Sequence, residues 1–362
     1  MSSYCKYYKE KKQVSYDNGI TWSDVVPAEY RKGELIQTGS MDCQTGPTGY
    51  STQYLTFVAV SAGTFSFEGT SSSSITNSTI QYSVDNGSTW YTLNSGVQSP
   101  TISAGQKIMW KGQLSPVSIV PFGIGSFTSS QKYNVEGNAM SLLYGDNFQN
   151  KTSFPSAGTN ELFFANLFSG STKLISAENL VLPATTLKLG CYEHMFDGCT
   201  SLTSTPSLPA TTLAEYCYNY MFAGCSSLTT VPSNMLPVTN LVEGCYQSMF
   251  RGCSSLATAP LLPATTLAEY CYSYMFAWCS SLTTAPELSA TTLVDYCFWG
   301  IFIDCASLNY IKCLATNISA TDCTFNWVNG VAPSGTFVKN SSMSGWETGV
   351  SGIPSNWSVQ NA

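Results

Sequence analysis

Four acidic residues recur at one position of a phrase that is repeated in the second half of this 362-residue chain. They are Glu215, Glu243, Glu269 and Asp295, and Leu189 takes the same place in the first copy. If the copies stack as strands do, about 4.8 Å apart, neighbouring carboxyls approach the separation of about 5–5.5 Å that retaining glycosidases use. Stacking alone produces this spacing, so a solvated acidic ridge with mildly raised pKa values is the alternative. We expect the ridge and no enzymatic activity.

The single histidine, His194, gives little support to nucleophilic catalysis. Its equivalents in the later copies are Tyr220, Ser248, Tyr274 and Gly300. A catalytic or metal-binding histidine is not expected at a position that changes so freely. With one histidine in the chain, a Ser-His-Asp or Cys-His site has almost no candidates. We therefore predict no catalytic residue, no metal and no cofactor.

Ten of the 14 cysteines form five pairs with a spacing of eight residues. If the intervening segment is helical, each pair is separated by about 12 Å, beyond the ~7 Å limit for a disulfide. Stacked copies predict two columns of buried, reduced thiols instead, since a free cysteine packs as a small apolar residue. Zinc is disfavoured because Cys-x₂-Cys spacing is absent. Cys5, Cys43, Cys313 and Cys323 lie outside these pairs, and the sequence leaves their redox state open.

The repeated phrase itself predicts the architecture that must hold these side chains. It reads Leu-Pro-Ala-Thr-Thr-Leu, Cys-Tyr, Met-Phe and Cys-Ser-Ser-Leu, and its Met-Phe (finally Ile-Phe) pairs begin at 195, 221, 249, 275 and 301. A period of 26 to 28 residues indicates a solenoid, in which each unit buries its apolar face against its neighbours. We expect residues 271–279 of one unit to form a short helix or 3₁₀ stretch and residues 280–284 to begin a stacking strand. Long regular surfaces favour binding over catalysis.

Residues that differ between otherwise near-identical copies mark the outward face. Tyr and Trp on such a face are candidate contact residues, because aromatic side chains dominate interface hot spots. Unselected variation on a soluble surface is the alternative. The predicted binding residues are Tyr220, Tyr274, Trp278 and Trp299.

The first half of the chain has the short, evenly spaced strand patterns of a sandwich. Candidate strands cover 54–60, 64–67, 80–84, 90–93 and 107–110. We predict a mainly β (α+β overall) protein with an N-terminal β-hairpin/β-sandwich region, a solenoid with short helical turns and a β-rich C-terminal cap. The predicted parts are 1–47, a β attachment segment; 48–135, a β-sandwich-like domain; 136–181, an N-terminal cap with a degenerate repeat; 182–313, the solenoid; and 314–362, the C-terminal cap.

Charge and hydropathy exclude several classes of function. The net charge is −7 and only 10% of residues are charged, which argues against nucleic-acid binding. No run reaches the length of a membrane span, so we expect no membrane insertion. The first residues lack the apolar region of a signal peptide. This favours a protein made in the cytoplasm and retained there or released from it, and the alternative is a protein whose leader has been removed.

Two segments fit the pattern Ser-x-Asp-x-Gly-x-Thr-Trp, and they resemble the Asp-box of sialidases. Physically this motif stabilises a β-hairpin, because Asp caps the turn, Gly supplies its geometry and Trp packs beneath it. Two copies cannot build a propeller, and no arginine set for a sialic-acid carboxylate is visible, so we interpret the motif as structural. Its residues are Asp17, Gly19, Trp22, Asp85, Gly87 and Trp90.

The order Cys-x-x-Leu, strand, Leu-Pro, Leu and aromatic-Phe-x-x-Cys resembles the BspA-like leucine-rich repeats of bacterial surface proteins. The resemblance covers residues 182–313 and extends weakly back to about 160, where residues 166–174 are a degenerate copy. It implies a leucine-rich-repeat solenoid with an adhesive role at a bacterial cell surface.

The two ends resemble something else. The segment from Tyr7 to Trp22 and the tail from Gly335 to Trp357 are similar to segments of fibre and tail-associated virion proteins of gut (crAss-like) bacteriophages. This resemblance implies a non-enzymatic virion fibre or adhesin that binds other virion proteins and a host surface protein or glycan. It also implies a homo-oligomer, with a trimer as one form. A bacterial BspA-like adhesin is the alternative, and a polysaccharide depolymerase is a third hypothesis.

Overall fold

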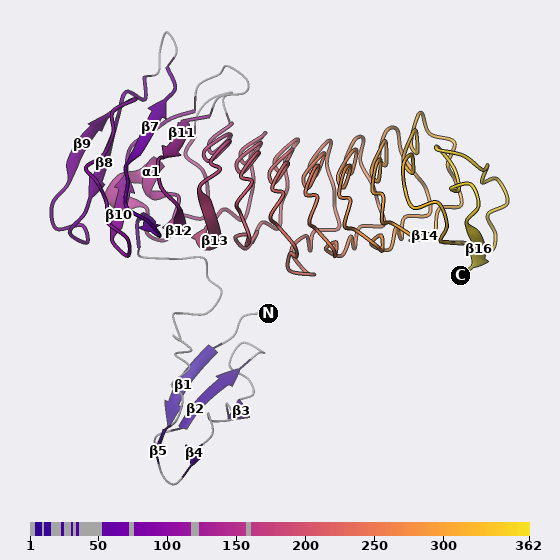
Figure 1. The fold of residues 1–362 in the computed structure, drawn as a ribbon, viewed down its shortest axis with the longest axis horizontal. Helices are drawn as coiled ribbons and strands as arrows, with labels where there is room; N and C mark the ends of the chain where they lie inside the picture. The colour runs from indigo at the N-terminus through magenta and orange to yellow at the C-terminus, as the bar shows by residue number, and fades with distance from the viewer. Residues whose placement is uncertain are drawn as a thin grey trace. The chain divides into compact units, whose positions relative to one another are not determined.

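The computed structural model describes residues 53–71, 76–116, 123–156 and 161–362 with their side chains, and the backbone of five short strands near the N-terminus. The chain forms two compact units, residues 1–50 and 51–362. In the first unit, β1, β2 and β3 form one antiparallel sheet and β4 pairs with β5 (Figure 1). These strands are β1 (Tyr4–Tyr8), β2 (Lys11–Ser15), β3 (Ser23–Asp24), β4 (Tyr30–Arg31) and β5 (Glu34–Leu35). Asp17, Gly19, Trp22 and Cys43 lie outside the described residues.

The second unit begins with two facing sheets. One has the strand order β13-β12-β6-β10-β8-β9 and the other pairs β11 with β7. Aromatic rings fill the space between them: Phe57 of β6 lies 5.2 Å from Phe65 of β7 and 4.8 Å from Phe127 of β11, between ring centroids. The strands β6 to β10 coincide with the five predicted ones. The bounds are β6 (Leu55–Ala59), β7 (Phe65–Gly69), β8 (Thr79–Ser83), β9 (Tyr91–Asn94), β10 (Lys107–Lys111), β11 (Gly125–Ser129), β12 (Tyr133–Asn138) and β13 (Leu174–Val181).

A short helical segment follows β12. It consists of α1 (Ser141–Tyr144) and the 3₁₀ turn η1 (Gly145–Asn147). The chain then returns through β13, which runs parallel to β12. Of the helices in the described ranges, none is long and apolar enough to cross a membrane. Apart from α1 and η1, the regular elements of the described residues are strands, so this part of the chain is mainly β, as predicted.

From β13 onward, successive repeats lie side by side as coils along the long axis of this unit (Figure 1). Alternate N–H groups of one coil donate to carbonyls of the next. The amides of Tyr192, His194 and Phe196 donate to the carbonyl oxygens 25 residues later, at 3.0, 2.9 and 2.8 Å. The same ladder recurs at every step of the repeat. These bonds consume the backbone donors that an isolated coil would leave unpaired.

The prediction of a short helix or 3₁₀ stretch in each repeat is wrong. The segment between the paired cysteines is a run of overlapping β-turns, in which the amides of Met195 and Asp197 donate three residues back, to Tyr192 and His194. Every fourth residue has a left-handed backbone, with φ of 54° at Gly190, 53° at His194 and 71° at Gly198. A helix cannot contain such residues, and half of its amides are already bonded to the neighbouring coil.

The stacking strand that was predicted to begin at residues 280–284, and at the equivalent residues of the other units, is also not continuous. Between β13 and β14 (Tyr310–Cys313) the described coils touch through isolated parallel bridges, such as Thr186 with Thr212 and Asn240 with Thr266. The repeat places prolines on this side, for example Pro260 and Pro263. Proline has no amide hydrogen to donate, so a continuous ladder cannot form there.

Rings and thiols fill the interior of the coils. One column of rings runs through Phe196, Phe222, Phe250, Phe276 and Phe302, with centroid separations between 5.3 and 6.0 Å. In a second column, the Sγ atoms of Cys199, Cys225, Cys253, Cys279 and Cys305 each donate to the carbonyl of a phenylalanine in the preceding coil, at 3.0 to 3.2 Å. All twelve described cysteines, Cys313 and Cys323 included, are free and buried. Burial raises the pKa of Cys253 to about 12, so the thiol form is retained.

The C-terminal part continues the coil before it ends in a sheet. Residues 322–330 were predicted as cap, yet they accept the same ladder from the preceding coil: the amide of Phe302 donates to Trp327 at 3.0 Å. Trp346 then stacks on Trp327 at 5.4 Å and covers this end. A parallel sheet of β14, β15 (Thr336–Lys339) and β16 (Ser358–Asn361) completes the unit.

Candidate binding site

Seven bulky residues occupy left-handed backbone positions on the turn side of the coils. Equivalent positions in other coils are glycine: Gly244 for Tyr270, Gly300 for Tyr274 and Gly252 for Trp278. A side chain at such a position costs about 1–2 kcal/mol relative to ordinary backbone. The seven residues are His194, Tyr216, Tyr220, Tyr270, Tyr274, Trp278 and Tyr296.

Five side chains form a continuous stack along this side, which we call the turn column. His194 lies parallel to Tyr220, with centroids 4.6 Å apart and planes 13° apart. The Arg251 guanidinium follows at 5.7 Å from the Tyr220 ring and 5.8 Å from the Tyr274 ring. Trp299 ends the column, 5.6 Å from Tyr274. Three of the four predicted binding residues therefore belong to one structure.

Two members of the turn column come from neighbouring positions because the regular position is small. Ser248 stands where three other coils have His194, Tyr220 or Tyr274, and it is fully buried. Arg251, three residues later, places its guanidinium between Tyr220 and Tyr274 at that level. The next small position is Gly300, and Trp299 fills the place beside it.

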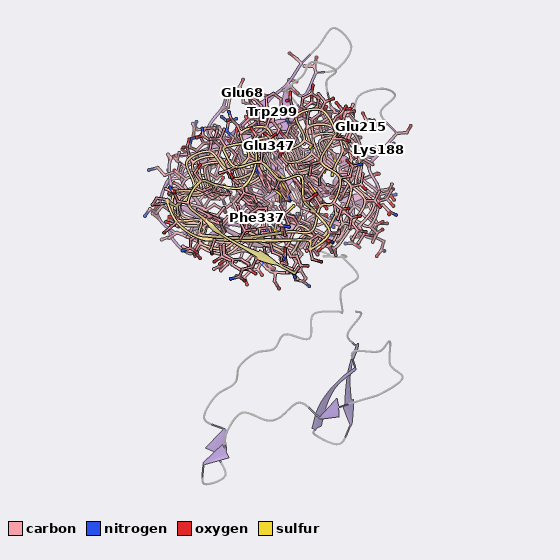
Figure 2. All side chains as sticks on the ribbon, turned by 90° about the vertical axis from the view of Figure 1, so that its right-hand side faces the viewer. Glu68, Lys188, Glu215, Trp299, Phe337 and Glu347 are labelled. Carbon is pink, nitrogen blue, oxygen red and sulfur yellow. The ribbon has the colours of Figure 1, made fainter. Side chains whose placement is uncertain are left out.

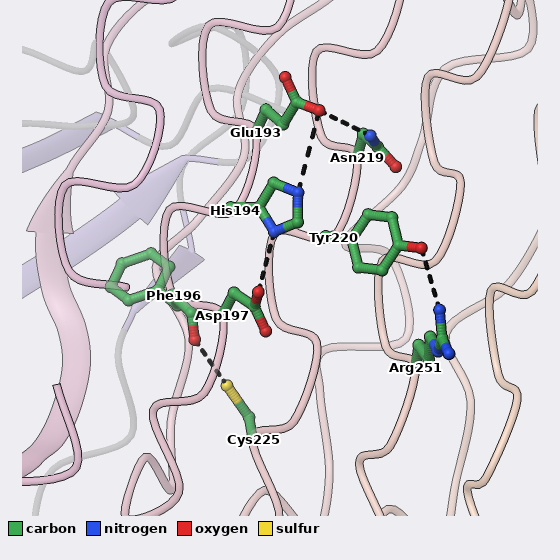
Figure 3. A network of polar contacts seen from close by, with 8 residues as sticks. All are labelled: Glu193, His194, Phe196, Asp197, Asn219, Tyr220, Cys225 and Arg251. Atoms are coloured by element: carbon green, nitrogen blue, oxygen red, sulfur yellow. Dashed lines mark hydrogen bonds and ion pairs between the residues drawn. The ribbon is translucent and has the colours of Figure 1, made fainter. Parts of the chain in front are cut away.

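Trp278, the fourth predicted residue, lies against the middle of the turn column. The Arg251 guanidinium is 4.6 Å from its ring centroid, and the Arg251 Nη1 donates to Tyr220 Oη at 3.0 Å (Figure 3). Trp278 remains 36% exposed. The arginine is thus held by three aromatic rings and one hydrogen bond on an accessible surface.

His194 closes the first end of the turn column between two acids (Figure 3). Its Nδ1 lies 2.9 Å from Asp197 Oδ2 and its Nε2 lies 3.9 Å from Glu193 Oε1. Burial raises the pKa of Glu193, although a hydrogen bond from Asn219 and the nearby His194 oppose the shift. From the sequence we expected no catalytic or metal-binding role for His194. Glu193 and Asp197 are its near neighbours in the chain, and the fold adds Tyr220 and Asn219 of the next coil.

The other end of the turn column widens into an aromatic cluster. Trp299 lies 5.5 Å from Tyr296 and 6.1 Å from Phe325, and Tyr296 stacks on Tyr270 at 4.6 Å. Phe325 is 44% exposed. Viewed from the C-terminal end, Trp299 lies toward one edge of the unit, away from Phe337 of β15 (Figure 2).

The acidic ridge takes part in the hydrogen bonding of the coils. Glu243 accepts a hydrogen bond from Tyr216 Oη, and burial together with this carboxylate raises the pKa of the Tyr216 hydroxyl above its usual range. Asp295 Oδ1 accepts the amide of Thr321 at 2.7 Å. Glu215 and Glu269 are exposed. Two of the four acids therefore have a local structural partner.

The second Asp-box segment forms the hairpin between β8 and β9. Asp85 Oδ1 accepts the Ser83 hydroxyl at 2.7 Å and the Thr89 amide at 2.9 Å. These bonds hold the pKa of Asp85 at about 2, below its ordinary value. Gly87 has a φ of 82°, and the Trp90 ring lies 3.7 Å from the point where a Gly87 Cβ would stand.

A cavity of about 560 Å³ lies where the sandwich meets the first coil. Glu68 is the only charged residue in its lining. Elsewhere among the described side chains, no three His, Cys, Asp or Glu residues are arranged to hold a metal ion. The lining consists of Glu68, Gly69, Thr70, Ser71, Gly123, Gly125, Ser126, Ala165, Asn166 and Ser169.

Comparison with known proteins identifies the class of the repeat. Residues 165–302 and 193–330 match the family model of the BspA type leucine rich repeat region, in six copies. The predicted resemblance of residues 182–313, with its extension back toward residue 160, is confirmed, and the match continues beyond residue 313 to residue 330. No curated protein and no solved structure matches the chain. Nothing in these comparisons supports the predicted phage resemblance of the two ends.

Arg251, the central residue of the site, was missed in the prediction from the sequence. Arg251 was visible as one of the variable residues, but it was not among the predicted binding residues. Two signals could have identified it: it is the only arginine of the repeats, and it stands three residues after the one serine in the His/Tyr position.

Proposed function

We propose that this protein is a non-enzymatic recognition protein, whose leucine-rich-repeat solenoid presents the turn column and Trp278 to a protein on another surface. The observation that carries the proposal is the retention of bulky aromatic side chains at left-handed backbone positions. Strained backbone of this kind clusters at functional sites. Glycine, which other coils use at the same positions, would remove the strain and also remove the surface.

The composition of the site supports protein recognition. Tyr, Trp and Arg are the residue types most enriched in interface hot spots, whereas Lys, Glu and Asp are depleted from interface cores. The turn column combines two tyrosines, one tryptophan and one arginine with His194, and Trp278 flanks it. A match to BspA type repeats agrees with an adhesive role at a surface.

The second part of the proposal concerns where the protein acts, on a virion or on a bacterial cell surface. A virion fibre or adhesin rests on the resemblance of the two chain ends alone, and a bacterial surface adhesin is equally compatible with the repeats. Detection of the protein in purified phage particles supports the first, and its detection on intact bacterial cells supports the second. Light scattering of the purified chain tests the proposed homo-oligomer.

The recognition proposal is tested by binding of the labelled full chain to intact cells of a panel of bacteria. The test variant combines Tyr220→Gly, Tyr274→Gly and Trp278→Gly, since glycine is the residue that equivalent coils tolerate. Matched controls are Tyr91→Ser and Leu261→Ser, at residues that are 49% and 60% exposed elsewhere.

We expect the triple variant to lose at least about tenfold in cell binding, because hot-spot truncations cost about 2 kcal/mol or more, while both controls bind as the parent does. Protease treatment of the cells should abolish binding. Equal binding by the triple variant contradicts the proposal, and protease-resistant binding with a signal on a glycan array indicates a saccharide partner instead.

A further inference from the structure

Arg251 is the one cation of the five repeats that has no acidic partner among the described residues. Residues 182–313 contain three basic residues. Lys188 pairs with Glu161 at 2.9 Å and Lys312 pairs with Glu287 at 3.0 Å. The Arg251 guanidinium instead packs against aromatic rings and donates one hydrogen bond, to Tyr220.

The guanidinium is held in place before any ligand arrives. It lies between the Tyr220 and Tyr274 rings and against Trp278, and its residue is half-buried. A guanidinium has five N–H donors in a rigid fork that fits a carboxylate with two parallel hydrogen bonds. Because the side chain is already ordered, less conformational entropy is lost when such a pair forms.

The surrounding rings favour an anion over a flat apolar ligand. His194 and Tyr220 turn their faces to each other, with planes 13° apart, so ligands meet ring edges along this part of the column. Ring edges carry the positive part of the aromatic quadrupole. A saccharide that stacks on aromatic faces finds little free face here, whereas a carboxylate meets N–H donors flanked by positive edges.

We propose that Arg251 binds the carboxylate of an Asp or Glu side chain on the protein that the turn column recognises. The inference rests on the proposed recognition function and names the chemistry of its partner at one point. Since the chain has a net charge of −7, long-range attraction does not guide an acidic partner. Selection of an acidic partner therefore depends on the short-range, bidentate hydrogen bonding to a carboxylate that arginine can make and lysine cannot.

Nuclear magnetic resonance of the ¹⁵N-arginine-labelled full chain tests this directly, because the sequence has only two arginines, Arg31 and Arg251. An Arg31→Lys background leaves a single Nε–H signal. The probes are a hexaglutamate peptide, a hexaglutamine peptide and trigalacturonate. We expect a saturable shift of the Arg251 signal with hexaglutamate and none with hexaglutamine.

The indole signal of Trp278, 4.6 Å from the guanidinium, provides the readout when arginine is replaced. Arg251→Lys keeps the charge and should bind hexaglutamate roughly tenfold more weakly, and Arg251→Gln should not bind it; thermal melting checks that both variants fold. No response of Arg251 to any probe, or equal affinity of the lysine variant, overturns the inference. A tighter response to trigalacturonate than to hexaglutamate also overturns it, in favour of an acidic saccharide.

The two proposals fail separately. If the triple glycine variant loses cell binding but Arg251 does not respond to acidic probes, recognition through the turn column stands and the carboxylate contact is wrong. If cell binding survives the triple substitution, the recognition proposal fails whatever Arg251 binds.

Discussion

The backbone at Trp278 allows a direct measurement of the strain that the binding surface imposes. Its φ of 62° matches the values of 71°, 67° and 74° at Gly198, Gly224 and Gly252, the equivalent residues of three other coils. Trp278→Gly and Trp278→Ala both remove the ring and its contact with Arg251. The difference in their free energies of unfolding therefore isolates the backbone.

We expect the glycine variant to be the more stable of the two. A Cβ at a left-handed position costs about 1–2 kcal/mol, and the extra freedom of glycine in the unfolded chain offsets about 0.5–1 kcal/mol of this. The midpoints of these two ranges give a net expectation of roughly 0.75 kcal/mol in favour of glycine. At Glu269, which is exposed and has ordinary backbone, the order should reverse, with alanine more stable by about 0.5–1 kcal/mol.

Urea unfolding followed by tryptophan fluorescence suits this comparison, because each pair of variants contains the same tryptophans. The comparison uses transition midpoints at equal slope, since a change in slope signals a change in the unfolded state. If Trp278→Ala is as stable toward urea as Trp278→Gly, or more stable, the strain argument is refuted. The main support for a selected aromatic surface is then lost as well.

Three further predictions concern the interior and the hairpin. Phe222→Ala should destabilise the unit by about 3–5 kcal/mol. This loss of unfolding free energy should exceed the loss caused by Phe302→Ala by about 0.5–1.5 kcal/mol, the value of one ring pair. The reason is that Phe222 stacks on two rings and Phe302 on one. Equal losses for the two variants in urea unfolding contradict this prediction. A thiol reagent at pH 8 should leave all twelve described cysteines unmodified until urea is added, since they are buried with raised pKa values; only Cys5 and Cys43 are outside this expectation. The pKa of Asp85 in the folded protein, about 2, lies below its ordinary value of 3.8, so the contribution of this carboxylate to the free energy of unfolding is complete above about pH 4 and is lost as the pH falls toward 2. Asp85→Asn should flatten the acid limb of a stability–pH curve over this window, and an unchanged limb counts against the hydrogen-bonded turn.

Regular spacing made the interior predictable. The recurrence of Phe, Leu and Cys every 26 to 28 residues required these side chains to meet their equivalents in the next copy. The columns of rings and the absence of disulfides among the described cysteines follow from that repetition. Five of the eight strands in the two facing sheets, β6 to β10, were likewise visible as short alternating or aromatic runs between Gly and Ser clusters.

Local backbone conformation was harder to predict, because the decisive bonds connect different coils. A segment such as 190–198 contains residues that are compatible with a helical turn, and nothing local forbids it. The neighbouring coil takes every second amide, and this converts the segment into β-turns with left-handed residues.

The sequence alone determined that the repeats share one interior and which side chains enter it, since apolar periodicity is a property of the chain. It also marked Tyr220, Tyr274, Trp278 and Trp299 as outward residues. Only the tertiary structure decided that Arg251 completes their column, because its guanidinium occupies the level of the small Ser248, between the rings of the preceding and the following coil. Contacts between residues of different coils depend on how each coil turns its side chains, and that orientation is fixed by hydrogen bonds that no single repeat contains.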